Sequence, residues 1–228
     1  MKYENIKKGI FLERPNRFIA HGLVDGHKEV IHVKNTGRCK ELLVPGATIY
    51  VEEFDNPHRK TKWDLIAVKK GDLFINMDSG APNKVVGEWL LKSQHSDFQG
   101  MTLMKSEVKY RSSRLDFYVE TKEKKIYIEA KGVTLEVDRV AKFPDAPSER
   151  AVKHVLELIQ AKEEGYDAYV FFVIKMKGIR YFTPNEDTHP QFKEVLIKAK
   201  EKGVKLLAYD CIVKPDELVI DAPVEIRL

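Results

Sequence analysis

The sequence predicts two domains of different class: an N-terminal β-barrel over residues 1–84 and a C-terminal α/β domain with a mixed sheet over residues 85–228. Three observations lead to this mixed fold class. Short apolar segments between turn residues fill the first third of the chain, two amphipathic helical patterns follow, and the apolar run at 168–174 is typical of a strand buried on both faces. Strands that alternate with helices in this way predict an α/β sandwich.

The first domain is expected to contain five strands, bounded by turn residues such as Asp25-Gly26 and Pro45-Gly46. The candidate strands are Arg17–Val24, Glu29–Val33, Thr48–Phe54, Asp64–Lys69 and Leu73–Met77. Five short strands in roughly eighty residues are typical of an OB-like β-barrel, a fold that commonly binds oligonucleotides. The alternative is a small β-domain that only packs against its neighbour, because a fold alone does not assign a function.

The second domain is expected to alternate helices and strands. The expected elements are helices at Asn83–Lys92, Pro147–Glu164 and Pro190–Lys202 and strands at Ala168–Ile174 and Val204–Tyr209. The helix at 147–164 has the clearest boundaries, because Asp145 or Ser148 can cap its first turn and Gly165 ends it.

A hairpin is expected between the first two helices, because the segments 115–119 and 126–131 both alternate apolar and polar residues around a polar turn at 121–124. A turn centred between residues 122 and 123 pairs residues whose numbers sum to 245, so Asp116 faces Glu129. Lys131 shares that face because side chains repeat with a period of two. The residues expected on the opposite face are Leu115, Phe117, Ile126, Ile128 and Ala130.

Two opposed carboxylates repel each other unless a cation lies between them, and a hard divalent cation with oxygen ligands resolves the repulsion. A lysine beside that ion can orient a water or offset charge on a phosphoryl oxygen. The alternative is an ordinary charged hairpin. Glu-x-Lys occurs four times in this chain, at Glu107/Lys109, Glu120/Lys122, Glu123/Lys125 and Glu129/Lys131, so the tripeptide alone carries little information.

Composition narrows the function classes. The net charge of +4 is uneven: residues 1–86 hold 15 Lys+Arg against 11 Asp+Glu, and residues 87–228 hold 24 of each. This excess of positive charge in the first part of the chain is compatible with binding to nucleic acid. No apolar run approaches a membrane span or a signal peptide, and two cysteines are too few for a disulfide framework, so we expect a cytoplasmic protein with no membrane partner. The sequence does not specify an oligomeric state.

The sequence also argues against two kinds of cofactor, zinc and nucleotides. The seven histidines show no HxxH or HExxH grouping, which argues against zinc. No Walker A motif or glycine-rich dinucleotide loop is present, so no nucleotide cofactor is expected.

Two basic loops of the first domain are candidates for binding nucleic acid. Their polar and charged residues are Asn35, Arg38 and Lys40 in one loop and Arg59, Lys60 and Lys62 in the other. Phe18 and Trp63 can stack on bases, as aromatic side chains do in single-strand binders, or can belong to the barrel core.

Several stretches together resemble the sugar fermentation stimulation protein A family. They are HVKNTGR at 32–38, ELLVPG at 41–46, RKT at 59–61, SRLDF at 113–117, EAKGVTL at 129–135 and FPDAPSER at 143–150. Their order and spacing match over nearly the full length. Lys34 and Cys39 stand where the family usually has proline and methionine, and Lys34 adds a cation to the basic residues.

The resemblance implies an OB-like first domain, a second domain similar to the PD-(D/E)xK nucleases, non-specific DNA binding and a regulatory role in sugar (maltose) metabolism. By that similarity Asp116, Glu129 and the Ala130 carbonyl would hold Mg²⁺ or Mn²⁺, and Lys131 would position the attacking water. Glu107 would support the metal through water. Arg114 and Arg150, near the start of the helix at 147–164, are candidates for phosphate contact.

Three functions therefore stay open from the sequence. The first is a DNA-binding protein with a metal-dependent phosphodiesterase core. The second is a non-catalytic DNA-binding regulator whose acidic cluster is inert. The third is an RNA-binding module, because OB-like barrels do not reliably prefer DNA.

Overall fold

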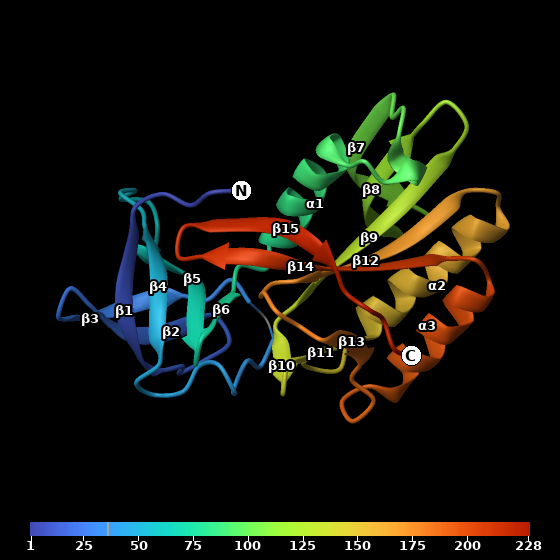
Figure 1. Cartoon of the computed structure of the whole chain (residues 1–228). Coiled ribbons are helices and arrows are strands. Elements are labelled where there is room, and N and C mark those ends of the chain that lie inside the picture. Colours follow the sequence, from blue (N-terminus) through green and yellow to red (C-terminus); the bar gives the residue numbers. More distant parts are fainter. Residues whose placement is uncertain (36) are drawn as a thin grey trace.

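The first strands of the chain close into a barrel, on the left in Figure 1. The computed structural model describes residues 1–35 and 37–228, so Thr36, within the motif at 32–38, lies outside the described residues. The barrel strands are β1 (Ile6–Glu13), β2 (Ile19–Val24), β3 (His27–His32), β4 (Thr48–Glu53), β5 (Trp63–Lys70) and β6 (Leu73–Asn76). Their order is β3-β2-β1-β4-β5-β6, and a parallel pairing of Ile31 with Trp63 joins β3 to β5 and closes the barrel. The predicted OB-like barrel is confirmed.

Strand β1 is the barrel element that the sequence analysis missed. Only Gly9 and Phe11 are buried in Ile6–Glu13, and lysines occupy two of its exposed positions. Such a segment has too weak an alternation to be recognised, and its pairing with β2 and β4 stabilises it instead. Trp63 is 4% exposed and belongs to the core, whereas Phe18 is 52% exposed. Of the two aromatic candidates, only Phe18 is available for stacking.

The C-terminal domain is built on a six-stranded mixed sheet in the order β15-β14-β12-β9-β8-β7. Its strands are β7 (Leu103–Tyr110), β8 (Ser113–Glu120), β9 (Lys125–Val133), β12 (Asp167–Ile174), β14 (Lys205–Lys214) and β15 (Glu217–Pro223). The central strands β9, β12 and β14 are parallel, and the outer strands are antiparallel to their neighbours. A smaller sheet contains β10 (Leu135–Val137), β11 (Val140–Phe143) and β13 (Tyr181–Pro184). The predicted α/β domain with a mixed sheet is therefore confirmed.

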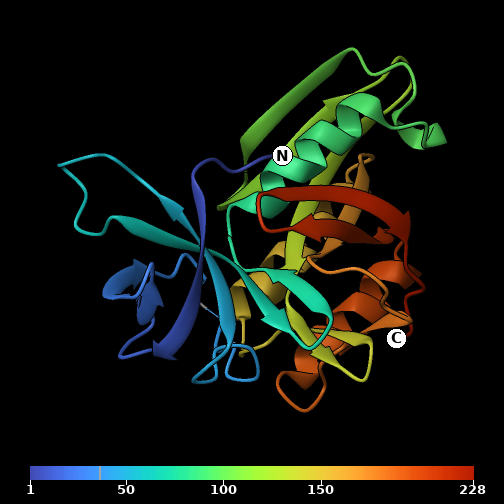
Figure 2. The same ribbon diagram turned by 60° about the vertical axis from the view of Figure 1, so that its left-hand side comes forward.

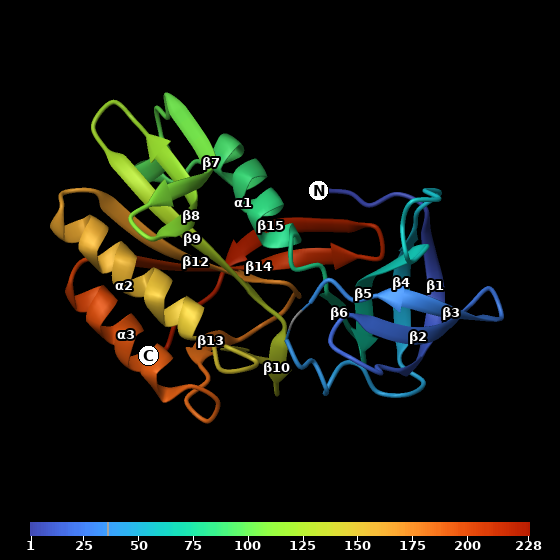
Figure 3. The same cartoon turned by 180° about the vertical axis from the view of Figure 1, so that it is seen from behind.

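Helices cover both faces of this sheet. Helix α1 (Ala81–Lys92) packs on one face and lies beside the β14–β15 hairpin (Figure 2). Helices α2 (Glu149–Glu163) and α3 (Pro190–Glu201) lie side by side on the other face (Figure 3). A short 3-10 turn, η1 (Ser96–Phe98), follows α1. Helix α1 includes residues 84 and 85, between which the domain boundary was expected. The position of that boundary stays a prediction.

Local sequence signals explain where α2 begins and ends. The hydroxyl of Ser148 accepts a hydrogen bond from the Ala151 N–H at 3.2 Å and caps the first turn. Gly165 follows the helix with a positive φ of 94°, a conformation that glycine adopts without strain. Asp145 does not cap the helix; its carboxylate accepts the N–H of Cys39 at 2.9 Å from the loop after β3.

The predicted hairpin register is confirmed in β8 and β9. Phe117 pairs with Ile128, Tyr118 with Tyr127 and Val119 with Ile126, and each pair sums to 245. Leu115 was expected on the same face of the hairpin as Phe117, and this expectation was wrong. Leu115 packs in the hydrophobic core under α2, whereas Phe117 packs in the core under α1. The regular β7–β8 pairing is interrupted opposite Asp116, where Glu107 adopts a left-handed φ of 55°, and the alternation of side chains is lost there.

The two domains are joined by backbone hydrogen bonds as well as by the chain. The Asn76 N–H of β6 donates to the Lys175 carbonyl at 3.0 Å, and the Tyr3 N–H donates to the Asp216 carbonyl in the β14–β15 turn at 2.8 Å. The amino group of Met1 donates to Glu88 of α1 at 2.8 Å. No helix in residues 1–35 or 37–228 is long and apolar enough to cross a membrane.

Candidate functional site

Glu129 is a buried carboxylate in the middle of β9, with only 3% of its surface exposed. Its Oε1 accepts hydrogen bonds from Lys131 Nζ at 2.6 Å and from Nδ1 of His154 on α2. Its Oε2 is buried and has no hydrogen-bond partner within the described part of the chain. A buried carboxylate oxygen without a partner is costly, so this atom points to a ligand.

The two carboxylates respond to their surroundings in opposite directions. Burial alone would raise the pKa of Glu129, but the hydrogen bond from His154 and the charge of Lys131 outweigh burial and hold the pKa below its usual range. Burial, together with the negative charge of Glu129, raises the pKa of Asp116 to about 6. At neutral pH both groups are charged, which costs free energy unless a cation compensates.

Asp116 lies where the β7–β8 pairing is interrupted, and two donors hold it there. Its Oδ1 accepts from Asn83 Nδ2 on α1 at 2.7 Å, and its Oδ2 accepts from the Ala130 N–H at 2.8 Å. The second contact ties Asp116 to the residue that follows Glu129 on β9. The structure thus brings Asp116 beside the stretch 129–131, although the paired part of the β8–β9 hairpin, as the structure describes it, ends at Phe117.

Asp116→Asn is expected to stabilise the metal-free protein at pH 7.5 by about 2 kcal/mol, because a raised pKa means that the folded state disfavours the ionised aspartate. The loss of stability caused by ionised Asp116 in the natural protein grows as pH rises from 3.8, the usual pKa of the group, through about 6, its pKa in the folded protein. The gain should therefore be present at pH 7.5 and vanish near pH 4. Urea unfolding in EDTA at the two pH values measures it, and an equal gain at both would contradict this account.

Glu107 occupies the rim of this site. It is exposed, and its Oε1 lies 3.3 Å from the same Asn83 Nδ2 that donates to Asp116. Arg114 lies 3.8 Å from its other oxygen. This position is compatible with the supporting role expected for Glu107, which stays a prediction.

A divalent cation fits the residues present. Residues 1–35 and 37–228 contain no group of three His, Cys, Asp or Glu side chains arranged to hold a metal, but the expected set is two carboxylates and a main-chain carbonyl. The unpartnered Glu129 oxygen and the neighbouring Asp116 are hard oxygen donors of the kind that Mg²⁺ and Mn²⁺ prefer.

His154 is a site residue that the sequence analysis did not identify. Besides the contact with Glu129, its Nε2 accepts from Arg150 Nε at 3.4 Å, which keeps the proton on Nδ1. His154 follows Arg150 by four residues, so both share one face of α2. That spacing was visible in the sequence, but the approach of α2 to β9 was not.

The charged residues of the barrel that are predicted to bind nucleic acid are of two kinds. Some are ion-paired: Lys34 with Asp78 at 3.1 Å, Lys62 with Glu53 at 2.6 Å, and Arg59 with Asp64. The others, Arg38, Lys40 and Lys60, are exposed. Paired cations contribute less to phosphate binding because their acidic partners compete with the phosphate.

The candidate residues of the barrel and those of the C-terminal domain line two separate clefts. Arg38 and Lys40 border a cleft of about 740 Å³ beside the barrel. Arg114 and Arg150 border another, of about 670 Å³, which is also lined by His154, the residue that contacts Glu129. Asn35 lies apart from both clefts, in a cavity between the domains.

Comparison with known proteins identifies the family. The profile described as the SfsA N-terminal OB domain matches residues 12–77, and that described as the sugar fermentation stimulation protein RE domain matches residues 80–217. Sugar fermentation stimulation protein homologs of Ruminiclostridium cellulolyticum and Clostridium beijerinckii are each 58% identical over 228 residues, which cover 100% of this chain and of each relative. The structure of Pyrococcus furiosus SfsA in complex with Ca²⁺ aligns with a TM-score of 0.91 at 26% identity, covering 100% of this chain and 98% of that one. The chain therefore belongs to the sugar fermentation stimulation protein (SfsA) family.

Proposed function

We propose that the chain is a divalent-metal-dependent phosphodiesterase that acts on nucleic acid. The observation that carries the proposal is the buried Oε2 of Glu129, which leaves a ligand oxygen available beside Asp116. These two carboxylates and the Ala130 carbonyl would hold Mg²⁺ or Mn²⁺. The Ca²⁺ bound by Pyrococcus furiosus SfsA supports a divalent cation as the cofactor.

The residues around the carboxylates have separate tasks. A divalent cation supplies positive charge to the phosphate and makes a bound water more acidic. Lys131, only 11% exposed and 2.6 Å from Glu129, offsets negative charge that develops on the phosphoryl oxygens. His154 and Asn83 orient Glu129 and Asp116 respectively, as residues behind metal ligands commonly do.

The substrate would be gripped through its phosphate backbone. Arg114 and Arg150 border the cleft next to the site, and Arg38 and Lys40 lie on the barrel. Contacts of this type position a strand without reading its sequence, so we expect non-specific binding that weakens steeply with salt. DNA is the proposed substrate, and competition with RNA of equal length tests that choice.

Incubation of the protein with single- and double-stranded DNA in Mg²⁺ or Mn²⁺ tests the activity. We expect cleavage with these ions and none in EDTA. Lys131→Met should lower the rate by on the order of 10²-fold, because it removes one group that stabilises developing charge. Lys122→Met, in the exposed hairpin turn, is the matched control and should cleave normally. Equal cleavage by all three proteins would reveal a contaminating nuclease.

One observation favours a second function, that of a non-catalytic DNA-binding regulator. Both oxygens of Asp116 already accept hydrogen bonds from the protein, from Asn83 and Ala130. An aspartate satisfied in this way can be structural. This function predicts DNA binding that EDTA does not change and no cleavage product with any divalent ion.

A further inference from the structure

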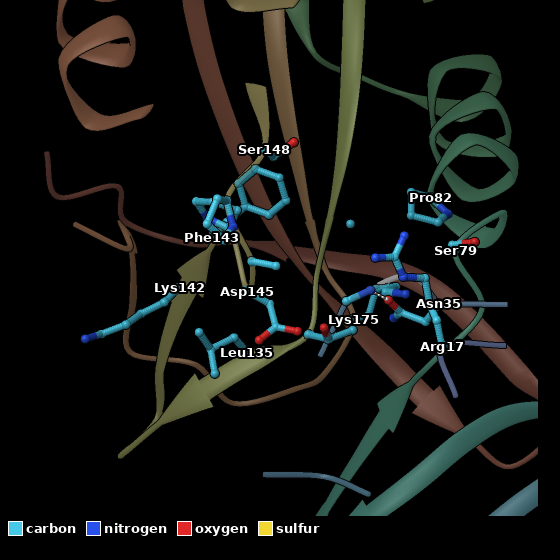
Figure 4. A pocket seen from close by; sticks show the side chains of 16 residues that line it. Arg17, Asn35, Ser79, Pro82, Leu135, Lys142, Phe143, Asp145, Ser148 and Lys175 are labelled. Carbon is cyan, nitrogen blue, oxygen red and sulfur yellow. Dashed lines mark hydrogen bonds between the residues drawn. The ribbon is translucent and has the colours of Figure 1, made fainter. Parts of the chain in front are cut away.

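A cavity of about 350 Å³ lies where the barrel meets the C-terminal domain (Figure 4). Residues from three of the stretches that carry the family resemblance line it: Asn35 and Gly37 from the first motif, and residues of the motifs at 129–135 and 143–150. The cavity has the size of a small-molecule site. None of the catalytic roles described above uses it.

The most unusual residue in this cavity is Lys175, which follows β12. The side chain is 1% exposed, and its Nζ donates one hydrogen bond, to the Asp78 carbonyl at 3.0 Å. An ammonium group carries three donors, and the Lys175 ammonium group has no other hydrogen bond or ion pair with the residues that the structure describes. Burial lowers the pKa of Lys175 to about 8. A buried cation with spare donors is costly, so the cavity is built to hold an acceptor.

Other polar groups complement Lys175 from the opposite sides of the cavity. Asp145 uses Oδ2 to accept from the Cys39 N–H, and its Oδ1 has no donor among the described residues. The amide oxygen of Asn35 accepts from the Gly37 N–H at 2.8 Å, and its NH₂ group has no acceptor among the residues that the structure describes. Figure 4 shows Lys175 between Asp145 and Asn35. The cavity therefore offers both donors and an acceptor.

The chemistry of this lining favours a nucleobase over a phosphate. Besides Lys175, the cations Arg17 and Lys142 line the cavity and would attract a phosphate, but a phosphate presents only acceptors and would leave the Asp145 carboxylate without a donor. The edge of a base presents donors and acceptors together, and its faces are apolar. Phe143, Pro82 and Leu135 supply apolar walls for those faces. Aromatic and apolar walls hold an extruded base in enzymes that take it out of the stack.

The cavity adjoins the carboxylate site through the backbone. Gly132 and Pro82 line it, and they are the chain neighbours of Lys131 and Asn83. A Cβ on Gly132 would lie 2.7 Å from Pro82 Cγ and 3.4 Å from Lys175 Cε, so a side chain there would force the wall to shift. Glycine thus keeps the cavity open one residue from the proposed site of cleavage.

We propose that this cavity takes up one unpaired or extruded nucleobase of a nucleic acid whose phosphate lies at the Asp116–Glu129 site. The inference rests on the proposed function only in requiring nucleic acid at that site. It deepens the proposed function, because it makes strands with an unpaired base the preferred substrate.

The test compares two duplexes that differ at one position, an unpaired 2-aminopurine in one and an abasic site in the other. Binding to both is measured by fluorescence anisotropy in Ca²⁺. We expect the natural protein to bind the base-containing duplex about tenfold more tightly, a factor within the range that stacking one base provides. The emission of 2-aminopurine should also change on binding, because the base enters a new environment.

Lys175→Met provides the matched variant. It should bring the ratio of the two affinities close to one while raising the thermal midpoint at pH 7, because it replaces a buried charge with an apolar side chain of similar length. Lys177→Met makes the same change two residues on, where Nζ is ion-paired with Asp210 at 2.9 Å, and should keep the tenfold ratio. A merely structural lysine would not combine higher stability with a lost preference.

Equal affinity of the natural protein for the two duplexes would overturn the inference. So would a Lys175→Met variant that loses only a preference for 5′-phosphorylated ends, because the cavity would then be an anion site. Cleavage assays in Mn²⁺ separate this inference from the proposed function. A base preference without cleavage would sink only the phosphodiesterase, and cleavage without a base preference would sink only the inference.

Discussion

Glu129→Gln is expected to lower metal-dependent cleavage of DNA by at least on the order of 10³-fold while leaving the fold intact. Glutamine has the same shape, and its carbonyl oxygen can accept from Lys131 and His154 as Oε1 does now. Its NH₂ group would replace the unpartnered Oε2 with a donor, which no cation can use as a ligand. Single-turnover cleavage in Mn²⁺ measures the loss, and calorimetric titration with Mn²⁺ measures the lost binding.

Glu123→Gln is the matched control for this prediction. Glu123 belongs to another of the four Glu-x-Lys pairs and is exposed in the turn of the same hairpin. The control should cleave DNA at the natural rate. If Glu129→Gln still bound Mn²⁺ with unchanged affinity, the two carboxylates would be structural and the non-catalytic function would be the better account.

Phe172→Ala is expected to cost about 3–5 kcal/mol of unfolding free energy, the largest stability effect that we predict, because it opens a cavity in a packed core. Phe172 is fully buried on β12, and its ring stacks on Phe182 with centroids 4.2 Å apart. The rings of Phe143 and Phe192 lie 6.2 and 6.4 Å away. Urea unfolding followed by circular dichroism measures the loss.

Phe18→Ala removes the same side chain from an exposed position and should change stability by no more than about 0.5 kcal/mol. The two tryptophans help to locate the effect, because Trp63 lies in the barrel and Trp89 lies on α1. If Phe172→Ala cost no more than Phe18→Ala, the aromatic cluster around β12 would not be the packed core described above.

The sequence predicted the parts of the site that lie within one hairpin. Side chains on paired strands alternate with a period of two, so the position of the turn was enough to predict the register in which Phe117 pairs with Ile128 and Tyr118 with Tyr127. The family resemblance found in the motifs at 32–38, 129–135 and 143–150 is confirmed by the profile matches and by full-length relatives. The strands β1, β7, β10, β11, β13 and β15 were missed. In β1, β7 and β15 charged residues dilute the apolar pattern, and sheet pairing stabilises these strands.

Contacts between distant segments were the part that the sequence did not reveal. His154 reaches Glu129 only because α2 packs on β9, and Lys175 faces Asn35 only because the barrel docks on the C-terminal domain. Within the first domain, Lys34 pairs with Asp78, which is 44 residues further along the chain, and the pair reduces the value of Lys34 as a phosphate contact. Local periodicity determined the fold class and the register of the hairpin that carries both carboxylates. The tertiary structure alone decided which oxygen stays unpartnered and where a cavity opens, because burial and hydrogen-bond satisfaction depend on residues far apart in the chain.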